Sequence, residues 1–421
     1  MPQHLAGTTI ARDVLAVWRN WEREGEVRAI GNSKDSAPVR RAAGPIEDPR
    51  TSGRLGWILG AVGLAALVVS FALSPANARS AAAQDWSPFV LVTGLLLIGL
   101  VANRDGLFAA AGHHLARSAR GGPMLFVGAT IMIAVVTALL NLDTSVAFLT
   151  PTLLYAARSR GGGEAPLLYG CVLLSNAGSL FLPGANLTNL IVLGHFHVSG
   201  LEFLSHMWAP ALAALVVTAA VIAVIERRSL RLASVAVPER EPFTLGIGAV
   251  AVAASTLCVL VLDSPAIAVA IIGIGAVGIR IARGREQVRP ALGVVGVPTL
   301  VGLFGLATAL GTLGRVWSGP AVLLSHLDLW GTAAVAALSS VLVNNLPAAS
   351  LLAARTPAHP YALLIGLNVG PNLFVTGALS WLIWMRSARV AGFRPSLARA
   401  SRIGVLAVPL SMAAAVAILA H

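Results

Sequence analysis

Four short polar segments interrupt a strongly apolar sequence, and they hold the side chains that could do chemistry. Asparagine recurs in all of them, at Asn141, Asn176, Asn186, Asn189, Asn344, Asn345, Asn368 and Asn372. Hydroxyl groups accompany it at Thr144, Ser175, Ser179 and Thr376. Amides offer donors and acceptors without a charge. We predict that this set binds a neutral polyhydroxyl solute or an ion, although any single asparagine could simply satisfy backbone groups freed at a helix break.

Asp143 is the carboxylate that we place inside such a broken apolar segment, whereas Asp85 and Asp263 are expected in loops or at span ends. A charge at membrane depth costs on the order of 2.5 to 3.5 kcal/mol on insertion scales, so it needs a reason. One reason is proton or cation binding. Another is helix capping, with a backbone N–H of Ser145 or Val146 as the donor. The two roles are compatible, and we predict Asp143 as the proton-coupling residue.

Transmembrane helices must position these residues. The chain of 421 residues is 56% hydrophobic and 11% charged, whereas soluble proteins carry about 25% charged residues. Its mean hydropathy is +0.79. A helix of about 20 residues crosses a bilayer, so the length allows roughly 10 to 12 transmembrane helices. The predicted fold class is an all-α polytopic membrane protein.

The order of spans and breaks recurs in two parts of the chain. We predict a polar tail over 1–54, disordered or partly an amphipathic helix, and a first span with its loop over 55–86. Repeat 1 then covers 87–241, a connecting helical hairpin 242–289, and repeat 2 290–421. Broken segments in corresponding halves indicate the binding site of a transporter. We therefore expect two inverted repeats with re-entrant hairpins and broken helices.

Arginine-rich loops set the predicted orientation. They lie at 104–122, 158–164, 226–241, 280–290 and 386–402, between apolar spans. Positively charged loops favour the cytoplasmic side, which explains the net charge of +12 without nucleic acid. The chain is thus expected as a multi-pass protein of the cell membrane (inner or plasma membrane), in contact with lipid and with a cytoplasmic N-terminal tail.

Patterns typical of enzymes and cofactor sites are missing from the sequence. It contains no P-loop, GxSxG or HExxH motif, which argues against an enzyme and against a cofactor. Cys171 and Cys258 lack a metal-binding spacing. His195 and His197 have no third ligand nearby, so no metal site is predicted.

The polar segments resemble those of the ion transporter superfamily, and most closely the arsenite/antimonite permeases of the ArsB type, which are related to citrate and dicarboxylate permeases. The similarity covers about Pro88 to Leu419. It rests on four stretches of the sequence: Asp143 to Pro151, Ser175 to Asn189, Ser339 to Pro347 and Gly366 to Trp384.

This resemblance implies two inverted repeats, each with a helical hairpin and an unwound helix, and a substrate bound between the hairpin tips. In arsenite permeases the substrate is a trivalent metalloid hydroxide, expelled in exchange for protons and sometimes with a soluble ATPase partner. The chain departs from the family pattern at four positions. Leu142 stands where the family has Asn, Asn176 and Asn368 stand where it has Asp, and Asn372 stands where it has Lys.

The leading hypothesis is a secondary active antiporter that exports arsenite, antimonite or a similar small oxyacid and so confers arsenic resistance. The alternative is a citrate or dicarboxylate transporter of the same superfamily, coupled to protons or sodium. An uncoupled channel is the competing class, and polar residues grouped between long apolar spans favour alternating access over a continuous pore. The sequence leaves open a homodimer.

Overall fold

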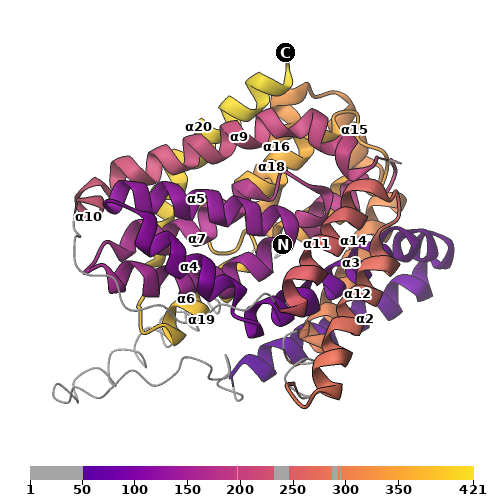
Figure 1. The fold of residues 1–421 in the computed structure, drawn as a ribbon. Coiled ribbons are helices and arrows are strands. Elements are labelled where there is room, and N and C mark those ends of the chain that lie inside the picture. The colour runs from indigo at the N-terminus through magenta and orange to yellow at the C-terminus, as the bar shows by residue number, and fades with distance from the viewer. Residues whose placement is uncertain (1–50, 197, 232–245, 287–292, 294) are drawn as a thin grey trace. The chain divides into compact units, whose positions relative to one another are not determined.

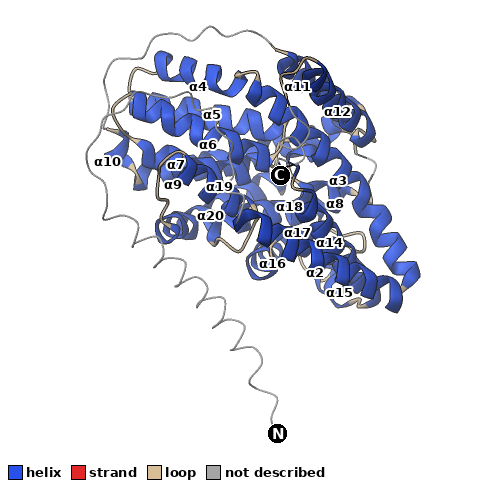
Figure 2. Cartoon of the chain, turned by 90° about the horizontal axis from the view of Figure 1, so that it is seen from below, coloured by secondary structure: helices blue, strands red, loops and turns tan. Residues whose placement is uncertain are grey.

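The computed structural model describes residues 51–196, 198–231, 246–286, 293 and 295–421. Residues 1–50 of the predicted tail, and His197, lie outside this part. Within it every regular element is a helix (Figure 2). Six of these helices are long and apolar enough to cross a membrane: α2 (Thr51–Leu73), α3 (Pro75–Arg104), α5 (Gly122–Leu139), α9 (Gly200–Ile225), α14 (Val297–Val316) and α20 (Leu397–Leu419). The prediction of an all-α polytopic membrane protein is confirmed.

Arginines from several loops meet at one end of the helices, which we call the basic end. Arg280 pairs with Asp105, and Arg399 pairs with Glu226. Arg158 lies 4.2 Å from the ring centre of Phe393. These contacts join loops that the sequence predicts on one side of the membrane.

The first hairpin enters from the basic end and returns to it. Its arms are α5 and α6 (Leu142–Ser159), and Asn141 forms its tip. The start of α5 lies against the backbone of Leu230, and Arg160, just after α6, donates to the carbonyl of Ala116. Asn141 ends one arm and caps the next, so an asparagine in an apolar run produces the sharp reversal.

The second hairpin is built the same way but from the opposite end, which we call the far end. Its arms are α16 (Leu329–Val343) and α17 (Asn345–Leu352), with Asn344 at the tip. Asn344 has a φ of 78°, a left-handed conformation that asparagine tolerates better than most residues. The chain leaves α17 at Ala353, whose carbonyl accepts from Gln84 and His195 at the far end.

A broken helix follows each hairpin. In the first half, α7 (Glu164–Gly178) ends at the turn η1 (Pro183–Ala185) and continues as α8 (Leu187–Leu193). In the second half, α18 (Pro360–Val369) ends at η2 (Gly370–Leu373) and continues as α19 (Ser380–Val390). The closing spans α9 and α20 lie side by side (Figure 1). Two halves with the same element order, entered from opposite ends, make an inverted repeat.

The remaining helices pack around the two repeats. The α2 and α14 helices touch through glycines, and a Cβ atom at Gly63 would overlap the backbone of Gly302. The hairpin of α11 (Ile247–Val261) and α12 (Ala266–Ala282) packs on α3, and Asp263 lies in its turn. Short helices α4 (Leu107–Ser118) and α10 (Arg227–Leu230) occupy segments expected as loops, and a third short helix, α15 (Gly319–Ser325), follows α14.

Two predicted boundaries are wrong. The division between 54 and 55 falls inside α2, which begins at Thr51. The division between 86 and 87 falls inside α3, which runs unbroken from Pro75 to Arg104. The polar residues near its start suggest a loop in the sequence, but the alanines between them favour a helix. As a result, Asp85 lies within a membrane helix and is 2% exposed, not in a loop.

Candidate functional site

The breaks of the two halves meet in a buried cluster of amides and hydroxyls. The side chain of Asn368, from the end of α18, lies at its centre. The Asn368 Oδ1 atom accepts from Ser179 Oγ and Asn186 Nδ2, each at 2.6 Å. Its Nδ2 atom donates to Asn189 Oδ1 at 2.8 Å. One asparagine of the second half thus binds three polar side chains of the first half.

A second link between the halves lies next to this one. Asn176 Nδ2 donates to Asn372 Oδ1 at 2.7 Å, and Asn372 Nδ2 donates to the Leu173 carbonyl at 3.0 Å. We call the linked side chains the amide network: Asn176, Ser179, Asn186, Asn189, Asn368 and Asn372. All are buried. The network brings together six of the residues predicted from the sequence.

The asparagines also cap the short helices that start at the breaks. Asn141 Oδ1 accepts from the Thr144 backbone N–H at 2.7 Å, and Asn186 Oδ1 accepts from the Thr188 N–H at 3.3 Å. Asparagine is among the best N-cap residues because its oxygen satisfies an N–H that the helix leaves free. The prediction that Asp143 caps α6 is therefore wrong: the cap is Asn141, and Asp143 lies in the first turn.

Asp143 is half-buried in the first turn of α6, two residues before Ser145. Its carboxylate makes no hydrogen bond or ion pair within the described part of the chain. Buried polar atoms without hydrogen-bond partners lie near it, on Asn141 (Nδ2) and Thr144 (Oγ1), and Asn176 carries another (Oδ1). Such atoms normally find a partner in native proteins. This corner therefore has the capacity to bind a proton or a small polar solute.

Serines join this corner to the amide network. Ser145 Oγ and Ser175 Oγ lie 3.2 Å apart in a shared hydrogen bond, and the next residue after Ser175 is Asn176. The first turn of α6 therefore packs on the last turn of α7.

Three predicted residues lie in a separate group at the second hairpin tip. The Asn345 backbone N–H donates to the Gly377 carbonyl at 2.8 Å, and Asn344 Nδ2 donates to the Thr376 carbonyl at 3.1 Å. The exposed Thr376 donates its hydroxyl to the Val341 carbonyl at 2.9 Å. In the described residues no hydrogen bond joins this group to the amide network. The predicted set is therefore divided between the amide network with the neighbouring first hairpin tip at Asn141 and a separate group at the second hairpin tip.

A polar cluster that the sequence reasoning missed lies at the far end of α3. It consists of Gln84, Asp85 and Arg315, and Arg315 Nη2 donates to Gln84 Oε1 at 2.6 Å. Asp85 is more deeply buried than Asp143, so Asp143 is not the one carboxylate in an apolar environment. The alanine run before Gln84 is the signal that could have placed this cluster in a helix.

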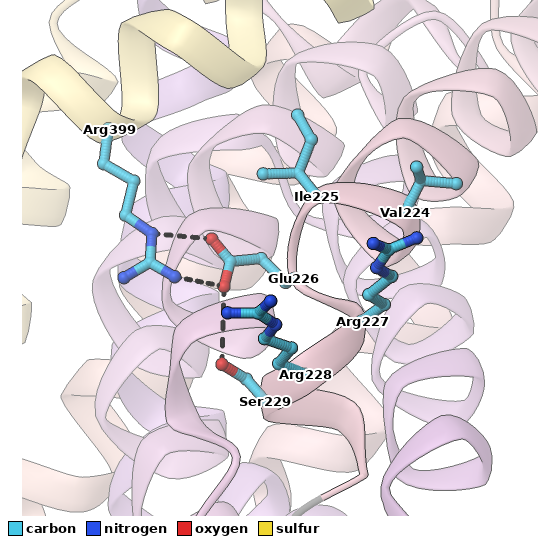
Figure 3. Close-up of a pocket in the computed structure, with 7 residues that line it drawn as sticks. All are labelled: Val224, Ile225, Glu226, Arg227, Arg228, Ser229 and Arg399. Carbon is cyan, nitrogen blue, oxygen red and sulfur yellow. Dashed lines mark hydrogen bonds and ion pairs between the residues drawn. The ribbon is translucent and has the colours of Figure 1, made fainter.

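A surface recess of about 570 Å³ opens at the basic end, away from the amide network. Figure 3 shows Arg399 of α20 facing Glu226 at the end of α9, with Arg227, Arg228 and Ser229 around them. Arg399 holds the buried Glu226 carboxylate with two hydrogen bonds, of 2.7 and 2.5 Å. The acid is thus neutralised by its partner. The recess shares no residue with the amide network, and the Arg399–Glu226 pair within it links α20 to the end of α9.

Comparison with known proteins decides the family. Residues 51–385 match the model of the citrate transporter family CitMHS. The chain belongs to this family. The CitMHS membership makes the protein a multi-pass membrane transporter.

Curated relatives of this CitMHS protein carry the name arsenical pump membrane protein. One from Escherichia coli is 26% identical over 335 residues, which is 71% of this chain and 78% of the relative. Another from Escherichia coli strain K12 is 25% identical and one from Yersinia enterocolitica 24%, each with the same coverage. The resemblance to ArsB-type permeases is confirmed.

A solved structure shares the fold of this CitMHS protein. The crystal structure of the Alcanivorax borkumensis YdaH transporter, described as having an unusual topology, superposes with a TM-score of 0.50. It is 14% identical, and the match covers 86% of this chain and 97% of that one. At this identity the likeness concerns the fold alone.

Proposed function

We propose that this protein is a proton-linked secondary carrier that exports a small neutral oxyacid such as arsenite or antimonite. The uncharged amide network is the observation that carries the proposal, since all its side chains are asparagine or serine. Arsenous acid is uncharged at neutral pH and presents three hydroxyl groups. Amides can donate to these groups and accept from them. The arsenical pump names of the relatives favour the same substrate.

Asp143 is the proposed proton site. Its carboxylate is half-buried, lies in the first turn of α6 and lacks a partner in the described residues. Proton uptake there removes a charge that is costly at membrane depth. Because the neighbouring Ser145 contacts Ser175, the proton and the substrate would compete within one connected group. Such competition is what exchange of one for the other requires.

The two hairpins supply a route for alternating access. One has its tip at Asn141 and enters from the basic end, and the other has its tip at Asn344 and enters from the far end. In this proposal each hairpin moves against the amide network in turn and opens the site to one side. Rocking of one repeat against the other around a fixed site is the common transporter scheme.

The family match favours a second candidate, a citrate or dicarboxylate carrier. A carboxylate substrate needs positive charge for recognition, usually from Arg, Lys or a bound cation. The network contains neither Arg nor Lys, so this candidate would depend on a co-transported cation and on amide N–H groups. For this reason we rank it second.

The test is arsenite accumulation in a metalloid-sensitive bacterial host that expresses the chain, with and without a protonophore. We expect lower accumulation than in the empty host, and the protonophore and Asp143→Asn should each abolish the difference. Asp263→Asn is the matched control, because Asp263 is exposed in the α11–α12 turn. Accumulation equal to that of the empty host, with the protein present in the membrane, combined with citrate uptake by membrane vesicles, would replace this proposal by the second candidate.

A further inference from the structure

Four elements meet around Gln84 at the far end of α3. Gln84 Nε2 donates to the Ile191 carbonyl at 2.7 Å and to the Ala353 carbonyl at 3.2 Å. Arg315 Nη2, from α14, donates to Gln84 Oε1 at 2.6 Å. Gln84 lies about 30 Å along α3 from the basic end, at a rise of 1.5 Å per residue. Within the described residues no hydrogen bond joins Gln84, Asp85 or Arg315 to a side chain of the amide network.

The two carbonyls that Gln84 binds belong to the ends of the two short helices. Ile191 lies in the last turn of α8, and Ala353 directly follows α17. Each helix begins at a break, α8 after Asn186 and α17 after Asn344. Gln84 thus holds the far ends of the two helices that start at the two groups of predicted site residues. Movement of either helix at its break must strain or release these bonds.

Asp85 lies next to Gln84 and has no partner of its own. It is 2% exposed, its Oδ2 atom is buried, and its carboxylate accepts no hydrogen bond within the described ranges. Arg315 is the cation of this cluster, and within the described residues it forms no salt bridge with Asp85. Instead Arg315 donates to Gln84 and, through Nη1, to the Gly311 carbonyl at 2.9 Å.

The other ionisable groups on the elements that pack around Asp85 at this end form no ion pair with it within the described residues. They are Arg79 of α3, His195 after α8, Asp263 between α11 and α12, and Arg355 after α17. His195 donates to the Ala353 carbonyl at 2.8 Å and Arg355 to the Arg315 carbonyl at 2.9 Å. Arg79 and Asp263 are exposed.

The observed contacts fit a neutral Asp85. A buried carboxylate that is ionised and unpaired is strongly unfavourable. Loss of its proton would favour pairing with Arg315, the cation bound to the adjacent Gln84, in a charge-assisted bond stronger than the one Arg315 now makes to the neutral Gln84. Gln84 would then lose the donor that orients its amide, and with it the geometry that serves both helix ends.

We propose that Asp85 is a second proton-binding group of this carrier, whose protonation fixes Gln84 and Arg315 on the ends of α8 and α17. Release of the proton to the aqueous side leaves a carboxylate that takes Arg315 from Gln84 and loosens both helices. The inference rests on the proposed proton-linked transport, to which it adds a residue at the far end. It assigns Asp85 a positioning role, since it acts on the site through the two helices.

Hydrogen–deuterium exchange of the full-length protein in lipid nanodiscs tests this proposal without a substrate. We follow peptides covering 187–193 and 345–353 between acid and alkaline pH, corrected for intrinsic exchange. In the wild type, protection should fall about tenfold as pH rises, as expected for loss of roughly one hydrogen bond at each helix end. Asp85→Asn should keep high protection at every pH, and Gln84→Leu should have low protection at every pH. Asp263→Asn, the control, should behave as the wild type.

Protection of both segments that is the same at all pH values in the wild type would overturn the proposal, and this result needs no variant. A pH step that persists in Asp85→Asn, or in Asp85→Ser if the asparagine variant does not fold, would also overturn it. The outcomes separate the two proposals. If the pH step in protection depends on Asp85 but the protein exports no arsenite, only the proposed substrate is refuted. If arsenite export depends on Asp143 but protection shows no pH step, only the role of Asp85 is refuted.

Discussion

Replacing Asn368 with alanine should destabilise the protein strongly, because two buried groups depend on short hydrogen bonds to this side chain alone in the described structure; a third, Thr188 Oγ1, lies 3.5 Å from Asn368 Oδ1 and is bound only weakly. Asn186 Nδ2 donates to it at 2.6 Å, and Asn189 Oδ1 accepts from it at 2.8 Å. Each buried polar group left without a partner costs about 1 to 3 kcal/mol, so the pair costs about 2 to 6 kcal/mol. Alanine regains at most about 0.7 kcal/mol in helix propensity, which is too little to compensate.

Other bonds of Asn368 contribute less to this loss. Ser179 Oγ keeps an alternative acceptor, the Asn176 carbonyl at 2.8 Å. The Leu364 carbonyl, which also accepts from Asn368 Nδ2, lies one turn earlier in the same helix and can keep its helical bond. The estimate therefore rests on Asn186 and Asn189 only.

The free energy of unfolding, measured by SDS titration in mixed micelles, checks this value. Ser411→Ala is the control, since Ser411 is also fully buried but its hydroxyl bonds only to backbone carbonyls of its own helix. We expect the control to cost under about 1 kcal/mol. If Asn368→Ala lies within about 1 kcal/mol of the wild type, the amide network does not join the two halves in the way described.

Three further substitutions test the elements around the site. Gly63→Leu should cost about 1 to 3 kcal/mol of unfolding free energy or detach α2, because its Cβ would overlap the Gly302 backbone. Gly275→Leu is the control and should be tolerated, because the space around Gly275 is open. Equal losses of stability in the two variants would contradict this packing. Asn344→Ala should cost about 1 to 2 kcal/mol in the same titration, because alanine disfavours a φ of 78° and cannot cap α17. Asn344→Gly should cost distinctly less, because glycine adopts this φ freely. A larger loss for glycine than for alanine would refute the idea that the backbone at Asn344 is strained. Glu226→Gln should cost only about 1 kcal/mol of unfolding free energy, because the Arg399 side chain is 49% exposed and its charge can be solvated by water. A loss above about 3 kcal/mol would mean that the ion pair is shielded from solvent.

The breaks of the fold could be predicted from the sequence, because asparagine in an apolar run has few roles other than to cap or to bind. Asn141, Asn186 and Asn344 each start a helix where the sequence indicates an interruption. The recurring pattern of spans and breaks predicts a repeat, whereas the inversion of the second half is implied by the resemblance to the superfamily.

The partners of these residues could not be predicted. Asn176 and Asn372 lie 196 positions apart, and nothing local in either segment favours one amide partner over another. Asp143 does not cap α6, because Asn141, two positions earlier, accepts the Thr144 backbone N–H and so fills the cap position. Asp85 was missed because neighbouring polar residues resemble a loop, whereas packing against α14 and α8 stabilises them as a helix.

The neutral side chains of the amide network also determine how the membrane potential acts on the carrier. One elementary charge that crosses 100 mV gains or loses about 2.3 kcal/mol of electrical work. Asn176, Asn368 and Asn372 bring no charge to the site, so its change of access moves at most the charge of Asp143. Under the proposed proton-linked scheme, reorientation with Asp143 protonated moves no charge of the amide network or of Asp143, so a voltage dependence of that step would come from charges outside the site, such as Asp85 and Arg315.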